Sequence, residues 1–286
     1  MPALISVNTR QEEEFSMNIK DIISVGKEEK PLDNIVSNGG YCGIFRTVAC
    51  IGDSLSSGEL ESCIDEKVGY HDYYDISWGQ FLARDAGCKV YNFSRGGMTA
   101  KEYCDSFAKE KGFYAEELKA QAYIIALGVN DCSRVLKGMI EFGTIDDVHP
   151  DAPESNANTF IGYYAKIISD YKKIQPKAKF FLMTMPRGTQ DAAERSELYD
   201  RFRETVYKLC EMFDNCYVID LRKYAPIYDE DFRKKFFLGG HLNSAGYRFT
   251  ALMVESYMDY IIRNNFEDFS QIGFVGTEFY NEKTKW

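Results

Sequence analysis

Residues 44–55 read IFRTVACIGDSL, an apolar run that ends in a glycine, an acid and a serine. The run is rich in Ile, Val and Phe and nearly free of charge, which is typical of a strand buried on both faces of a parallel sheet. Gly52 and Asp53 then favour a turn, and Ser54 stands at the expected start of a helix. The stretch therefore predicts that Ser54 lies at the carboxyl edge of a buried sheet.

Four further apolar runs repeat this pattern along the chain. With residues 44–51, the expected strands are 88–93, 122–127, 179–185 and 216–221. The helical patterns between and after them cover residues 78–86, 99–107, 159–174, 192–213 and 245–262. Strands that alternate with helices indicate βαβ units and a parallel sheet. The sequence thus predicts an α/β protein with a three-layer α/β/α flavodoxin-like fold, a five-stranded parallel sheet, and ligands bound beyond the carboxyl ends of the strands.

Composition and charge exclude several classes of protein. The 286 residues are 45% hydrophobic and 27% charged, which is ordinary for a globular chain. The net charge of −10 argues against a nucleic-acid partner. No window approaches about 20 consecutive apolar residues, so we expect no membrane association. The first 15 residues lack a secretory pattern and the eight cysteines form no CxxC pair, so we expect a cytoplasmic protein with reduced thiols and no metal centre.

The chain divides into three parts by composition. Residues 1–43 are polar and acidic and form an N-terminal extension, expected either to pack on the main domain or to be a solvated arm. Residues 44–264 form that domain. Residues 265–286 are aromatic, which predicts a tail that packs on the domain or on a partner chain and is compatible with a homo-oligomer. The segment 133–158 is long for a loop. It is expected either to cover the site or to be a surface insertion that contains a helical turn.

Four short motifs follow predicted strands at one edge of the sheet: residues 52–55, 92–99, 128–131 and 237–247. Each alone has an ordinary explanation as a turn, a helix cap or a structural histidine. Together they bring Ser54, Gly97, Asn130 and His241 to one place. Independent turns would not be expected to supply a nucleophile, two further hydrogen-bond donors and a base at the same edge.

This arrangement resembles the GDSL or SGNH hydrolase family over residues 44–262, most of the chain. Gly52-Asp53-Ser54-Leu55 is similar to the nucleophile motif of the family, and residues 92–99 to its glycine motif, with Gly97 as the amide donor. Gly128-Val129-Asn130-Asp131 matches the Gly-x-Asn-Asp motif, and His241 matches the base.

The resemblance implies acyl transfer through serine. Ser54 would attack the carbonyl of a small-molecule ester while His241 takes its proton. The N–H groups of Ser54 and Gly97 and the side-chain amide of Asn130 would stabilise the oxyanion. We expect Asp53 and Asp131, which belong to the same motifs, to support these residues. The implied mechanism requires no metal or organic cofactor.

One position departs from the family. Its usual Asp, three residues before the histidine, is replaced here by Leu238. We predict that a main-chain carbonyl of Leu238 or Gly239 accepts the Nδ1–H of His241. The alternative is a carboxylate from another segment, of which Asp229, Glu230 and Asp231 are nearest in sequence.

The leading hypothesis is a serine esterase that removes short acyl groups from a carbohydrate or a small metabolite. The lost acid also leaves open a catalytically weak or inactive member that binds carbohydrate or serves as a scaffold. A nucleotide-binding domain is disfavoured, because no phosphate-binding glycine loop follows a strand.

Overall fold

A computed structural model of the chain describes residues 23, 26 and 28–281. Its centre is a five-stranded parallel sheet in the order β4-β1-β5-β6-β7. The strands are β1 (Thr47–Gly52), β4 (Lys89–Asn92), β5 (Ala122–Ala126), β6 (Lys179–Met183) and β7 (Cys216–Ile219). The predicted flavodoxin-like sheet is confirmed, and each strand lies in one of the apolar runs, except that β1 extends one residue further, to Gly52. The first strand begins later than expected, because residues Gly40–Ile44 form the 3₁₀ helix η1.

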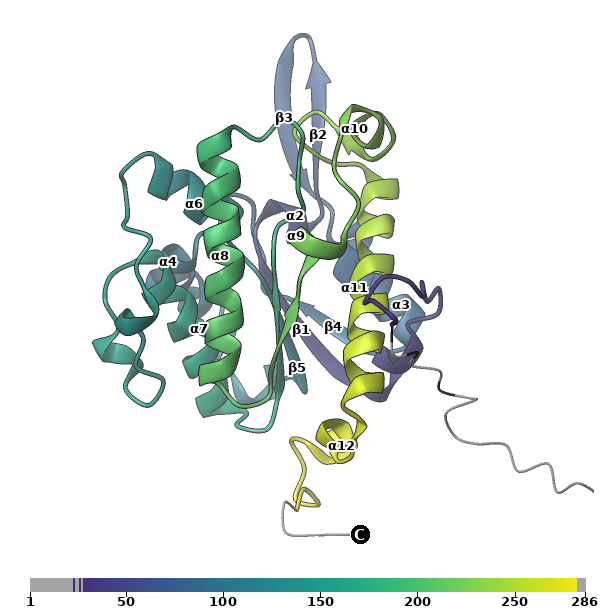
Figure 1. The fold of residues 1–286 in the computed structure, drawn as a ribbon, viewed down its shortest axis with the longest axis vertical. Coiled ribbons are helices and arrows are strands. Elements are labelled where there is room, and N and C mark those ends of the chain that lie inside the picture. Colours follow the sequence, from purple (N-terminus) through teal and green to yellow (C-terminus); the bar gives the residue numbers. More distant parts are fainter. Residues whose placement is uncertain (1–22, 24–25, 27, 282–286) are drawn as a thin grey trace, which may run out of the picture.

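Helices cover both faces of the sheet (Figure 1). One face carries α7 (Phe160–Ile174), α8 (Ala193–Met212) and a helix over residues 100–110 that consists of α4 (Ala100–Glu102), a π-helical turn η3 (Tyr103–Phe107) and α5 (Ala108–Glu110). The other face carries α3 (Trp78–Ala86) and α11 (Ser244–Asn264). Two buried apolar clusters, one for each face, hold the three layers together. Within the described residues no helix has the length and apolarity needed to cross a membrane.

Four of the five predicted helices begin at polar caps, whereas α8 follows Ala192, whose side chain makes no cap hydrogen bond. Ser77 accepts from the N–H of Gln80 at the start of α3, and Thr159 accepts from Gly162 at the start of α7. Asn243 does the same for α11 by accepting from Gly246. Such caps satisfy backbone donors that have no partner inside the helix, and they place the start of α11 directly after His241.

An antiparallel hairpin lies between the first strand and α3, where no strand was predicted. Its strands are β2 (Glu59–Ile64) and β3 (Lys67–Asp72), joined by Asp65 and Glu66. It projects from the carboxyl end of the sheet beside α10 (Glu230–Phe236) (Figure 1). The remaining elements are short: α2 (Ser54–Ser57), η2 (Tyr74–Ile76), η4 (Glu116–Leu118), α6 (Val129–Leu136), η5 (Ile145–Asp147), η6 (Pro153–Ser155), α9 (Leu221–Tyr224), β8 (Phe237–Leu238), β9 (His241–Leu242), α12 (Phe266–Phe269) and η7 (Ile272–Phe274).

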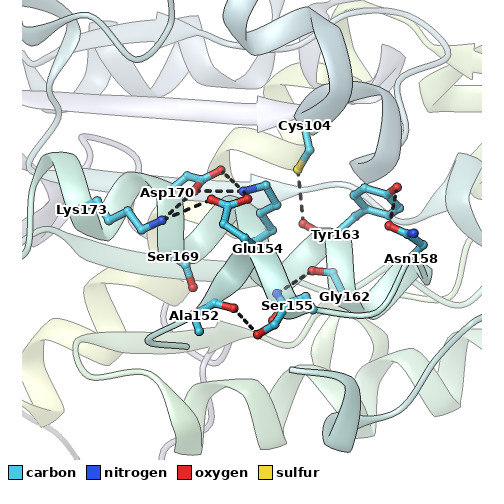
Figure 2. A network of polar contacts seen from close by, with 12 residues as sticks. Cys104, Ala152, Glu154, Ser155, Asn158, Gly162, Tyr163, Ser169, Asp170 and Lys173 are labelled. Carbon is cyan, nitrogen blue, oxygen red and sulfur yellow. Dashed lines mark hydrogen bonds and ion pairs between the residues drawn. The ribbon is translucent and has the colours of Figure 1, made fainter. Parts of the chain in front are cut away.

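The long loop after β5 is attached to α7 over its second half (Figure 2). Glu154 forms ion pairs with Lys166 at 3.0 Å and Lys173 at 3.6 Å, two residues of α7. Asn156 Nδ2 donates to the carbonyl of Gly162 at 3.0 Å. Exposed ion pairs stabilise little individually, but together these contacts fix residues 150–158 on the outer surface of α7.

Both ends of the described chain contact α11 or its surroundings. Glu29 pairs with Arg263, and the N–H of Tyr41 donates to Asp259 at 2.8 Å. Phe269 and Val275 of the tail are buried against the same core cluster. Residues 1–22 and 282–286 of the predicted extension and tail lie outside the described residues.

The turn that ends β1 has no room for a side chain at Gly52. A Cβ there would lie 2.4 Å from the Cβ of Ser56 and 3.3 Å from the carbonyl oxygen of Ala126. Such contacts force the neighbouring backbone to move. The glycine of this motif is therefore required by the close approach of α2 to the end of β1.

Gly52→Ala should lower the free energy of unfolding by about 1–3 kcal/mol, because the added methyl group overpacks the turn. Gly43→Ala is the control, since its new Cβ would meet only the carbonyl oxygen of Ala86, at 3.4 Å. Urea denaturation of both variants measures the difference. Equal stabilities would contradict the steric explanation.

Candidate active site

Ser54 is the first residue of α2, at the carboxyl end of β1. Asp53 caps this short helix by accepting from the N–H of Leu55 at 3.0 Å, and Gly58 ends it at φ +85°. The cap and the tight turn fix the Ser54 backbone, and the residue is 9% exposed.

The predicted glycine and asparagine motifs lie against this turn. The Ser94 hydroxyl is 2.9 Å from Ser56 Oγ, which joins the segment after β4 to α2. Gly97 adopts φ +72°, a conformation that favours glycine. Asn130 Nδ2 donates to the carbonyl of Met98 at 3.2 Å, so the two predicted donor segments are in contact.

The supporting residues Asp53 and Asp131 are both buried carboxyl groups. Burial raises the pKa of Asp53 to about 7, against the effects of the Leu55 N–H and of His241, which lower it. Burial also raises the pKa of Asp131 to about 7, although the Ala100 N–H donates to its carboxylate at 2.8 Å and lowers the pKa. Each structural role is clear: Asp53 caps α2, and Asp131 fixes the start of α4.

His241 lies in β9, which packs against α2 and β2. The hydroxyl of Tyr247, one turn into α11, is 2.6 Å from the carbonyl oxygen of Glu59 and 3.2 Å from that of Ser54. Tyr247 therefore joins the histidine-bearing segment to the nucleophile turn and to the base of the hairpin. The four predicted motifs meet at one edge of the sheet.

The group that orients His241 is a carboxylate from the hairpin. Glu61 Oε1 lies 2.6 Å from His241 Nδ1 and accepts from the N–H of Gly240 at 2.8 Å. A Cβ at Gly239 would lie 2.0 Å from Glu61 Oε2, and Gly239 has φ +67°. The pair of glycines before the histidine thus makes room for Glu61, whose side chain is only 14% exposed.

The prediction that a main-chain carbonyl binds Nδ1 is wrong. Leu238 pairs with His241 across β8 and β9 and is 52% exposed, and the Gly239 carbonyl accepts from Arg233 at 3.3 Å. The three acids nearest in sequence all interact with the backbone or the lysines of α10. Asp229 caps that helix, Glu230 pairs with Lys234, and Asp231 pairs with Lys235.

Sequence reasoning missed Glu61 and its neighbour Glu59. The available signal was the period of two: residues 59, 61 and 63 share one face of a strand. Glu59 Oε1 lies 3.1 Å from His241 Nε2, so the two carboxylates flank the imidazole. In the described part of the chain no cluster of three His, Cys, Asp or Glu side chains is arranged to hold a metal ion.

The model of the GDSL-like lipase/acylhydrolase family matches residues 50–249, more than half of the chain. The protein belongs to this family. The matched region begins in β1 and ends in α11, so it contains Ser54, Gly97, Asn130, Glu61 and His241. Ester hydrolysis is therefore the general class of reaction that family membership supports.

Solved structures share the fold of this GDSL-like protein at low sequence identity. A family two carbohydrate esterase from Clostridium thermocellum, in complex with cellohexaose, has a TM-score of 0.53 and 14% identity, over 78% of this chain and 65% of that one. A Lactobacillus plantarum protein has a TM-score of 0.56 and 17% identity, over 76% and 97% of the two chains. No curated protein matches the sequence.

Glu61→Ala should lower kcat for ester hydrolysis on the order of 10³–10⁴-fold with little change in KM, because Nδ1 loses its acceptor. Glu61→Gln removes the charge and can turn an N–H toward Nδ1, which selects the wrong tautomer, so its kcat should fall to a similar degree. Asp231→Ala, which removes one of the acids nearest in sequence, is the control and should match the unaltered enzyme. Unchanged kcat in Glu61→Ala would contradict this assignment.

Asp131→Asn should weaken the pH dependence of stability. Because the pKa of Asp131 is about 7 in the folded state, against an ordinary value of 3.8, the folded protein holds a proton that the unfolded chain releases over this range. The free energy of unfolding should therefore fall as the pH rises from about 4 to 7. Asn still accepts from Ala100 but cannot ionise, so urea denaturation should show a smaller fall in the variant. The same fall in both proteins would show that Asp131 is ionised in the folded state.

Proposed function

We propose that this protein hydrolyses carboxylic esters through an acyl-enzyme on Ser54, with His241 as the base and Glu61 as the acid that orients it. The observation that carries the proposal is the 2.6 Å contact between Glu61 Oε1 and His241 Nδ1. A carboxylate at Nδ1 fixes the tautomer in which Nε2 is the basic nitrogen, and it stabilises the imidazolium that forms during attack.

The proposed reaction has two stages, acylation of Ser54 and deacylation by water. Ser54 Oγ attacks the ester carbonyl as Nε2 of His241 takes its proton, and Nε2 then protonates the leaving alcohol. Water attacks the acyl-enzyme with Nε2 again as the base, which releases the carboxylic acid and restores Ser54. The N–H groups of Ser54 and Gly97 and the second N–H of the Asn130 amide are the proposed donors to the oxyanion.

The substrate class proposed is a short acyl group on a carbohydrate or a small metabolite. The similarity in fold to a carbohydrate esterase solved with cellohexaose supports this choice. The replacement of the usual acid by Leu238 would favour an inactive protein, but Glu61 brings a carboxylate to the same histidine from another segment.

Ser54→Ala should reduce hydrolysis of p-nitrophenyl acetate by at least about 10³-fold, because the nucleophile is lost. A fluorophosphonate probe should label the unaltered protein at Ser54, located by mass spectrometry, and should leave the Ala variant unlabelled. Ser270→Ala, which removes an exposed serine of the tail, is the matched control and should be labelled and active. An adduct on another serine, or full activity in Ser54→Ala, would refute the proposal.

A further inference from the structure

Glu59 is a second carboxylate in contact with the imidazole of His241, and it has no part in the mechanism above. Its Oε1 lies 3.1 Å from His241 Nε2, the nitrogen that must exchange protons with Ser54 and with the leaving alcohol. Glu59 and Glu61 are two residues apart in β2, so the alternation of the strand directs both toward the histidine.

The Glu59 carboxylate is enclosed by the site. Its side chain is 12% exposed, and a Cβ on Gly96 would lie 2.1 Å from Oε2, so the carboxylate rests against the glycine motif. Burial raises the pKa of Glu59, as do the charges of Asp72 and Glu61, while His241 lowers it. Among the ionisable groups that act on Glu59, only the histidine lowers its pKa.

In the tautomer that lets Nε2 act as the base, Nε2 carries no hydrogen. Glu59 Oε1 then receives no hydrogen bond from the imidazole, although it lies 3.1 Å from Nε2 and is still enclosed. A buried charged acceptor without a donor is costly. An ester offsets this cost if its alcohol part brings a donor to the same place, next to the ester oxygen that Nε2 protonates.

We propose that Glu59 determines specificity by accepting a hydrogen bond from a hydroxyl group of the leaving alcohol. This hydroxyl is on the carbon adjacent to the one that bears the ester oxygen. The preferred substrates are then partially acylated polyols and sugars with a free vicinal hydroxyl. This inference rests on the proposed esterase function and names its leaving group. The base of the hairpin is held independently of the Glu59 side chain, because Tyr247 donates to the Glu59 carbonyl at 2.6 Å.

The test compares 2-hydroxyethyl acetate with 2-methoxyethyl acetate, in which a methyl group replaces the hydrogen of the vicinal hydroxyl and so removes the donor. The ratio of their kcat/KM values does not depend on how much of a preparation is folded. The unaltered enzyme should prefer the hydroxyl ester, and Glu59→Ala should lower that preference by about tenfold or more, the value of a hydrogen bond to a charged group. Glu59→Gln, which keeps a neutral acceptor, should give an intermediate ratio and carries the test if the Ala variant does not fold.

Glu117→Ala, an exposed acid far from the site, is the control and should keep the ratio of the unaltered enzyme. Equal ratios in the unaltered enzyme and in Glu59→Ala, with p-nitrophenyl acetate still hydrolysed, would overturn the role of Glu59 and leave the esterase proposal standing. If none of these esters is hydrolysed, the esterase proposal fails and this inference fails with it.

Discussion

The hydrogen bond between Glu61 and His241 Nδ1 joins the two parts of the molecule on which the site depends. His241 lies in β9, directly before α11, while Glu61 belongs to a hairpin that follows the nucleophile turn in the chain. Because the acceptor is a carboxylate at 2.6 Å, one contact sets the tautomer of the base and supplies negative charge beside it. Gly239 and Gly240 allow that approach by leaving space and by donating a backbone N–H.

Relocation of the acid changes what the site can select. If the acid were three residues before the histidine, the hairpin would contribute no residue to catalysis. Here β2 carries Glu61 to one imidazole nitrogen, and its period of two then brings Glu59 to the other. In the mechanism that we propose, the same strand completes the site and also lines the place where the leaving group enters, which would couple catalysis to specificity.

The fold was predictable from the sequence because parallel strands buried on both faces are continuous apolar runs, such as residues 122–126, and because polar caps mark the helices. Ser54, Gly97, Asn130 and His241 could be brought to one edge by the same reasoning, since the carboxyl ends of parallel strands coincide. The hairpin could not. Its turn residues Asp65 and Glu66 have φ of +50° and +63° and are not the Asn-Gly or Asp-Gly pair that marks such turns. Without the hairpin, a contact between residues 180 positions apart in the chain has no local signal.

A crystal structure of the protein after reaction with a fluorophosphonate is the decisive test of whether Glu61 orients His241. We expect an adduct on Ser54, a Glu61 carboxylate oxygen within about 3.0 Å of His241 Nδ1, and Nε2 within hydrogen-bond distance of an adduct oxygen. A main-chain carbonyl at Nδ1, with Glu61 turned away into solvent, would contradict this expectation.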